Sequence, residues 1–219
     1  MTERVAAVSH SNITTLPPAY SDFSEVLNAT SLPEWIDRNF LRHDPYAFSS
    51  AGKNYFADFV AQCSKNYDVD PNGIYCIGSG ATGLSFNPYK YTAEGPKKFS
   101  RSSDLDIAII SPYYFETAWR DLRLAAHPAY SSPSQRLMRK IDHQRGRMFD
   151  GAIVANKLMA HLSFGGPWSL ALRRMEYEWQ DTLNITGGLN FWIYRDYWSV
   201  RSYVAEGIEK CREKARISQ

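Results

Sequence analysis

The sequence contains few cysteines, and they show no pairing pattern. There are three, Cys63, Cys76 and Cys211, and they lie far apart in apolar-periodic segments. An odd and dispersed set does not supply the disulfide framework of a small secreted domain. We therefore expect small core side chains in a reducing compartment, and a cytoplasmic location.

Long apolar runs and zinc-ligand spacings are also missing. No run of about 18 uninterrupted apolar residues exists, which is the length that a membrane-spanning helix needs. Residues 1–20 contain no long apolar segment of the kind found in signal peptides. The five histidines have no His or Cys partner at zinc spacing. These absences predict a soluble protein with no membrane partner and no zinc site.

A strong net charge is absent too, since the chain carries +2. Basic residues nevertheless outnumber acidic ones between residues 97 and 147, where they are Lys97, Lys98, Arg101, Arg120, Arg123, Arg136, Arg139, Lys140, Arg145 and Arg147. Solvated helix faces are the ordinary interpretation. The alternative is a cationic surface that receives a triphosphate or RNA.

The first third of the chain predicts helices followed by a strand. Residues 1–30 are rich in Ser, Thr, Asn and Pro and predict a loose lead-in to a single domain over 31–219. Ser31 to Glu34 has the form of a capping box with proline at the first helical position, so a helix is expected to about Leu41. A second helix is expected over roughly 50–67. After a turn at 70–73, the apolar residues 74–77 predict a buried strand.

The rest of the chain alternates loops, strands and helices. Polar residues 87–100 predict a surface loop, and residues 105–110 a second strand that Pro112 stops. Residues 113–181 are expected to be mostly helical, with 152–162 as one helical stretch that Gly165-Gly166-Pro167 breaks. Residues 189–194 form a third apolar run, and Asp196 is expected to cap a final helix. This order predicts an α/β core with N-terminal and C-terminal helical flanks.

Two aspartates stand at alternate positions where the second strand begins. Asp104 and Asp106 point to the same face because side chains alternate along a strand. Two ionised carboxylates in close contact repel each other by about 4 kcal/mol at an effective dielectric constant of about 20. A divalent metal ion is the usual relief. The alternative is a strand start whose carboxylates cap neighbouring amides.

The glycine-rich turn at residues 78–83 reads Gly-Ser-Gly-Ala-Thr-Gly. It fits a dinucleotide-binding pattern, but Pro88 follows too early for the packed helix that this pattern requires. Walker A and protein-kinase motifs are absent. The remaining interpretation is a turn that holds a phosphate through backbone amides and the Ser79 hydroxyl.

Together, the Gly78-Ser79 turn and the Asp-Leu-Asp strand resemble the nucleotidyltransferase superfamily. The resemblance covers residues 75–109, and Ser103-Asp104-Leu105-Asp106 is particularly similar to the minimal nucleotidyltransferases. It implies a small mixed-sheet α+β core between the helical flanks.

The resemblance also implies an activity and a site. A nucleoside triphosphate would bind with two Mg²⁺ ions, and its nucleoside monophosphate would pass to a hydroxyl of a protein or RNA acceptor. Asp104 and Asp106 would be the catalytic, metal-holding pair. The nucleotide-binding residues would be Gly78, Ser79, Gly80 and Ser103.

Two features depart from the family pattern. The interval between Ser79 and Asp104 is longer than in the minimal members, which implies an inserted loop near residues 87–100. Its basic residues, with Arg101, either contact phosphate or acceptor or are merely solvated. The family also uses a third carboxylate on a later strand, but the best such strand here offers Asn190. Asp150 and Asp196 are the other candidates, and we expect each at the start of a helix instead.

Two rival functions follow from the missing acid and from the family's range. One is a catalytically degenerate nucleotide-binding module of antitoxin type that regulates a partner toxin or antiviral defence protein. The other is a cyclic-dinucleotide or oligonucleotide synthase. The aromatic residues between 191 and 203 either stack a base or pack in the core.

Overall fold

The centre of the protein is a twisted mixed β-sheet. The computed structural model describes residues 26, 31–41, 44–49, 54–92 and 95–217. Its main sheet has the strand order β1-β4-β6-β5, formed by β1 (Ile74–Ile77), β4 (Leu105–Ile110), β6 (Leu189–Tyr194) and β5 (Ala152–Val154). Strand β4 is antiparallel to β1 and parallel to β6, and β5 is antiparallel to β6. The expected α+β class with a mixed sheet is confirmed.

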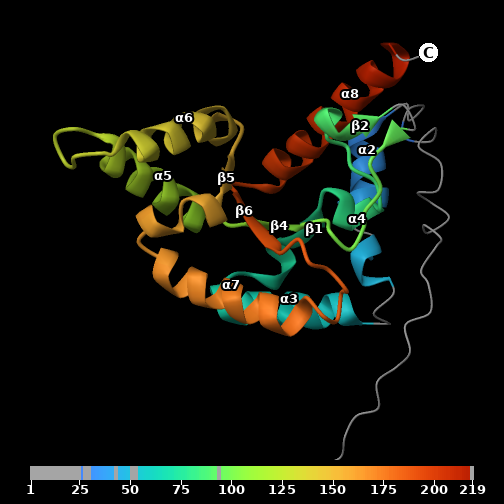
Figure 1. The fold of residues 1–219 in the computed structure, drawn as a ribbon, viewed down its shortest axis with the longest axis horizontal. Coiled ribbons are helices and arrows are strands. Elements are labelled where there is room, and N and C mark those ends of the chain that lie inside the picture. The colour runs from blue at the N-terminus through green and yellow to red at the C-terminus, as the bar shows by residue number, and fades with distance from the viewer. Residues whose placement is uncertain (1–25, 27–30, 42–43, 50–53, 93–94, 218–219) are drawn as a thin grey trace, which may run out of the picture.

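Helices cover one face of this sheet closely (Figure 1). These are α3 (Tyr55–Tyr67) and α7 (Gly165–Trp179), which pack on each other and on the sheet. On this side the ring of Tyr67 lies 4.4 Å from that of Phe191 and 4.8 Å from that of Trp168, measured between centroids. Apolar side chains on alternate positions of the strands therefore form the main core here.

The opposite face is covered only in part. Helices α5 (Pro112–Ala126) and α6 (Gln135–Phe149) form an arm that extends beyond edge strand β5 (Figure 1). The long helix α8 (Tyr197–Ile217) crosses the same face, and Tyr203 packs its ring against Trp192 of β6. The short α2 (Leu32–Ile36), continued by a π-helical turn over Asp37–Leu41, is tied to α8 through Asp37 and Arg201.

Several local signals act as expected. The Asp196 carboxylate caps α8 as predicted, by accepting from the Ser199 N–H at 2.7 Å. Ser111 and Ser134, for which no cap was predicted, also accept from backbone N–H groups and cap α5 and α6. The three cysteines are buried and unpaired. Within the described ranges, no helix combines the length and apolar character that a bilayer crossing requires.

Other predictions are wrong. The segment 152–162 is not a helix, because Ala152–Val154 is a strand followed by two 3-10 turns. Residues 165–167 begin α7 instead of breaking a helix, since proline is compatible with a first helical turn. Asp150 ends α6 and does not start a helix. Ser31 makes no side-chain cap at α2, and the proline of that turn follows Leu32. The expectation for residues 1–30 lies almost wholly outside the described residues.

Candidate functional site

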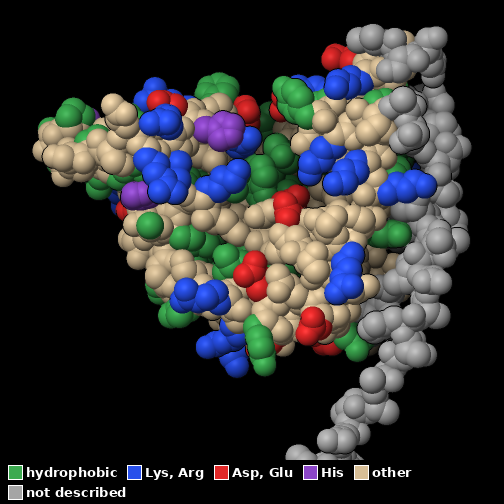
Figure 2. All heavy atoms as spheres, viewed as in Figure 1, with side chains coloured by type: hydrophobic (Ala, Val, Ile, Leu, Met, Phe, Trp, Pro, Cys, Tyr) green, Lys and Arg blue, Asp and Glu red, His purple; other side chains and the backbone are tan. Residues whose placement is uncertain are grey.

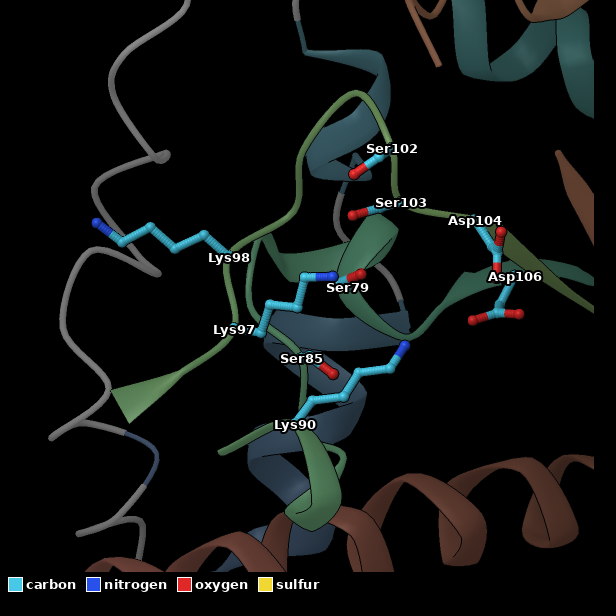
Figure 3. A pocket seen from close by; sticks show the side chains of 9 residues that line it. All are labelled: Ser79, Ser85, Lys90, Lys97, Lys98, Ser102, Ser103, Asp104 and Asp106. Atoms are coloured by element: carbon cyan, nitrogen blue, oxygen red, sulfur yellow. The ribbon is translucent and has the colours of Figure 1, made fainter. Parts of the chain in front are cut away.

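The two aspartates line one pocket at the start of β4. Leu105 is fully buried between them, so Asp104 and Asp106 point away from the core that α3 and α7 cover. The pocket has a volume of about 160 Å³ and is almost entirely polar; its lining residues are Ser79, Ser85, Lys90, Lys97, Lys98, Ser102, Ser103, Asp104 and Asp106. Figure 3 shows the two carboxylates next to each other at one side of it. The predicted pair therefore meets the predicted serine.

The turn after β1 is held close to Asp106. Gly78 has φ of 65°, and a Cβ atom there would lie 3.0 Å from Asp106 Oδ2. Glycine is required because a side chain would strain the backbone and press on the carboxylate. The turn continues into the short helix α4 (Ser79–Thr82), which places the Ser79 side chain in the pocket.

Two of the predicted nucleotide-binding residues, Gly78 and Gly80, are not among the residues that line the pocket. Gly80 is buried, and a Cβ atom there would come 2.6 Å from Leu105 Cδ1. Its lack of a side chain lets α4 sit against β4. Ser103 does line the pocket, and its Oγ accepts from the Ser100 N–H at 3.0 Å.

The inserted loop contributes cations to the same pocket. Its two ends pair with each other: the Ser85 N–H donates to the Lys97 carbonyl at 2.8 Å, and the Phe99 N–H to the Gly83 carbonyl at 2.8 Å. A small hairpin, β2 (Tyr91–Thr92) and β3 (Gly95–Pro96), forms its tip. In Figure 3, Lys97 extends toward Ser79 and Lys90 toward the aspartates, while Lys98 turns away. The sequence alone left open whether these basic residues contact a phosphate or are merely solvated.

Strand β6 supplies two partners for Asp106 that sequence reasoning did not assign. Asn190 lies opposite Asp106 in the parallel register, and its amide donates to Asp106 Oδ1 at 3.2 Å. Trp192 Nε1 donates to the same oxygen at 3.3 Å. The alternation of β6 was the available signal, because it puts positions 190 and 192 on one face.

The pKa of the Asp106 carboxyl is raised above its usual range. Burial is the main cause, and the nearby Asp104 carboxylate adds to the rise. Hydrogen bonds from Trp192 and Asn190, together with the charge of Lys90, oppose it. A desolvated carboxylate beside a second one is an electrostatically unfavourable arrangement that a bound cation relieves.

A glycine pair before β6 fixes the backbone on which Asp104 lies. A Cβ atom on Gly187 would come 2.4 Å from the Ser103 carbonyl carbon and 2.6 Å from the Asp104 nitrogen. The Leu105 N–H donates to the Gly188 carbonyl at 2.9 Å. The close approach of the two loops therefore sets the position of the first aspartate relative to β6.

The donor set suits Mg²⁺ held jointly by protein and phosphate. Mg²⁺ prefers a few carboxylate oxygens plus phosphate and water, and Asp104, Asp106 and the serine hydroxyls offer oxygen donors next to cationic lysines. Among the described residues, no three or more His, Cys, Asp or Glu side chains gather as a self-sufficient metal cage. Asp150 ends α6 and Asp196 caps α8, and neither is among the residues that line the pocket.

No family model, curated protein or solved structure matches the chain.

Proposed function

We propose that the protein is a Mg²⁺-dependent nucleotidyltransferase that uses the pocket at Asp104 and Asp106. The observation that supports it best is the convergence of two adjacent carboxylates with Ser79 and the loop lysines in one polar pocket. Carboxylates of this kind hold metal ions, and serines and lysines bind phosphates. A nucleoside triphosphate bound with its metal ion would use both the carboxylates and the phosphate-binding side chains.

The chain's own residues have distinct roles in this proposal. Lys90 and Lys97 offset the charge of the triphosphate, and Ser79 orients it by donating from its hydroxyl. Asn190 and Trp192 hold Asp106 Oδ1, which keeps the carboxylate in one rotamer with its other oxygen toward Gly78. They are positioning residues. The bound Mg²⁺ would supply charge neutralisation at the phosphates.

The proposed transfer forms one bond to the α-phosphorus and breaks another. The hydroxyl oxygen of the acceptor forms a bond to the α-phosphorus, and the bond from that phosphorus to the bridging oxygen breaks. Pyrophosphate leaves, and the hydroxyl proton passes to water beside the exposed Asp104 carboxylate. A partner toxin or defence protein remains an expectation of the resemblance alone.

Label transfer tests the proposal. The protein is incubated with each α-³²P-labelled NTP, MgCl₂ and cell extract, and labelled RNA and protein are separated. In the Asp104→Asn/Asp106→Asn variant the rate of label transfer should fall by at least about a hundredfold, which is the loss expected when an interaction that stabilises the transition state is removed. The matched control is Asp58→Asn/Asp181→Asn, which removes two exposed aspartates elsewhere. Equal labelling by the site variant and the wild type would reject the proposal.

A second function is favoured by Asn190, which cannot accept a proton or carry a negative charge. With this amide opposite Asp106, the site would hold the nucleotide as a regulatory module without turning it over. Calorimetry with ATP and Mg²⁺ would then show binding, and a coupled assay would show no pyrophosphate release. Release that is stoichiometric with labelled product would rule this alternative out.

A further inference from the structure

Helix α6 is the most basic element near the candidate site. Its fifteen residues include five Lys or Arg side chains and one aspartate, while the whole chain carries only +2. The rest of the protein is therefore net negative. A local excess of positive charge on one helix is a feature of surfaces that bind polyanions.

Most of this charge lies on one face of α6. Spacings of four, three and four residues place the face's members one above another; we name Arg136, Lys140, His143 and Arg147, with Arg139 at its margin, the α6 stripe. Leu137 and Ile141 point into the core from a different side of the helix. From its first to its last member the stripe runs about 16 Å at the rise of an α-helix.

The stripe is not neutralised by the protein. Arg145, which lies on the other side of α6, pairs with Asp142 at 3.1 Å. By contrast, Arg136 and Arg139 are exposed and have no carboxylate partner within the described residues. Lys140 donates to a backbone carbonyl, that of Lys157, at 2.9 Å, so its positive charge is not offset by an acid.

One end of the stripe meets the candidate site. The Arg147 guanidinium carbon lies 5.9 Å from the centroid of the Trp192 ring. Trp192 in turn donates to Asp106 Oδ1 at 3.3 Å. A continuous path of contacts therefore leads from the cationic face of the helix, over an aromatic ring, to the carboxylates.

Basic side chains also border the site on its other side. Figure 2 shows Lys and Arg side chains over α6 and over the region of the inserted loop, on two sides of a hollow with an acidic side chain in its floor. Lys90 and Lys97 contribute to the loop side of the pocket. A polyanionic chain bound along the stripe would thus reach the candidate site between two groups of basic side chains.

We propose that α6 binds a single-stranded RNA whose terminal ribose hydroxyl is the acceptor at Asp104 and Asp106. This inference rests on the proposed function and selects RNA over protein as its acceptor. Arg136, Arg139 and Lys140 have no carboxylate partner among the described residues and suit the repeated phosphates of a nucleic-acid strand, and the stripe contains no apolar side chain that would anchor a protein. In the reaction the terminal hydroxyl oxygen bonds to the α-phosphorus, pyrophosphate leaves, and the hydroxyl proton passes to water.

Fluorescence anisotropy with a fluorescein-labelled, 20-nucleotide single-stranded RNA tests the stripe. Arg136→Gln/Arg139→Gln should raise the Kd by about tenfold in low salt and reduce the slope of log K against log[salt] by about 1.4, the value for two lost phosphate contacts on a single strand. Arg173→Gln/Arg174→Gln on α7 is the matched control, because it removes two adjacent exposed arginines on the opposite side of the sheet.

The outcomes separate this inference from the proposed function. Equal Kd values for the two double variants would show that the stripe does not bind the RNA. Displacement of the RNA by an oligoglutamate peptide at similar concentration would also overturn the inference, because it would indicate an acidic protein partner. ATP binding is measured on the wild type by calorimetry. If ATP binds and RNA does not, the stripe is wrong; if RNA binds and ATP does not, the proposed function fails and the acceptor role fails with it.

Discussion

Single residues in this site act mainly by what they leave open or hold fixed. Gly78 leaves room for the Asp106 carboxylate, and Gly187 leaves room for the Ser103–Asp104 backbone. Trp192 and Asn190 fix the side of Asp106 that faces β6. The two carboxylates are thus positioned by neighbours that carry no charge.

The absence of a side chain at Gly78 can be tested directly. Gly78→Ala adds a Cβ atom 3.0 Å from Asp106 Oδ2 at a φ of 65°. The strain should lower the free energy of unfolding by about 1–2 kcal/mol and weaken ATP binding. Urea denaturation and calorimetry measure the two effects.

Gly146→Ala is the control: it lies in α6 with open space around it, so it should stabilise by about 0.5–1 kcal/mol. Gly78→Ala matching this gain would contradict the geometry.

The raised pKa of Asp106 predicts a pH-dependent stability. Between the unfolded-state pKa and the higher folded-state pKa, the folded protein binds more protons than the unfolded chain. Without Mg²⁺, the contribution of Asp106 to stability is therefore present at low pH and is lost as pH rises through its folded pKa. Asp106→Asn removes this loss, so the variant should be more stable than the wild type at neutral pH, and the difference should shrink toward pH 4.

Thermal unfolding in metal-free buffer from about pH 4 to pH 8 measures that difference. Asp58→Asn is the matched control, since it removes an exposed aspartate on α3. A stability gain in Asp106→Asn that is independent of pH would show that the carboxylate's titration is not its cause.

At the scale of elements, the sequence predicts the site better than the helices around it. Strands β1, β4 and β6 are mostly apolar segments of four to six residues with turn residues near their ends, so both their existence and the alternation at Asp104 and Asp106 could be predicted. Strand β5 has three residues, which is too short to show a period, and its apolar character fits a helix equally well.

The rest of the site depends on contacts between distant segments. Nothing local says that Lys97 pairs its backbone with Ser85, or that Asn190 lies opposite Asp106. Parallel register between β4 and β6 is set by packing of segments more than eighty residues apart, as the Asn190–Asp106 contact illustrates. The strand position that faces Asp106 holds an amide, Asn190, where the resemblance implies a third carboxylate.

The inserted loop is expected to act as one phosphate-binding element. Lys97→Gln removes the positive charge and shortens the side chain by one atom, so ATP affinity should fall by about 1.5–3 kcal/mol, a ten- to hundredfold loss, as for a lost hydrogen bond to a charged group. Stability should change by less than about 0.5 kcal/mol because the side chain is exposed. Calorimetry and urea denaturation measure both quantities. Lys65→Gln on α3 is the control, and an equal loss of affinity there would refute the assignment.

For the whole molecule, the two faces of the sheet have different tasks. The face under α3 and α7 carries a closely packed aromatic core around Tyr67, Trp168 and Phe191. The other face, between the α5–α6 arm, α8 and the inserted loop, is only partly covered (Figure 1) and holds the polar pocket with Asp104, Asp106 and the loop lysines. Unfavourable electrostatics at Asp104 and Asp106 are tolerated because the opposite face is well packed.

This division predicts that the ligands stabilise the entire fold, because Asp104 and Asp106 belong to the central strand end and not to a separate loop. At a hundredfold excess over Kd, a ligand that binds only the folded state adds about 2.7 kcal/mol. For a chain of this size that raises Tm by about 5–10 °C.

Scanning calorimetry with Mg²⁺ and α,β-methylene-ATP should show this rise, with a smaller one for the analogue alone. Asp104→Asn/Asp106→Asn should abolish the magnesium-dependent part, since both variant side chains are neutral. A rise that is the same with and without Mg²⁺ would mean that the carboxylates do not hold the metal with the triphosphate.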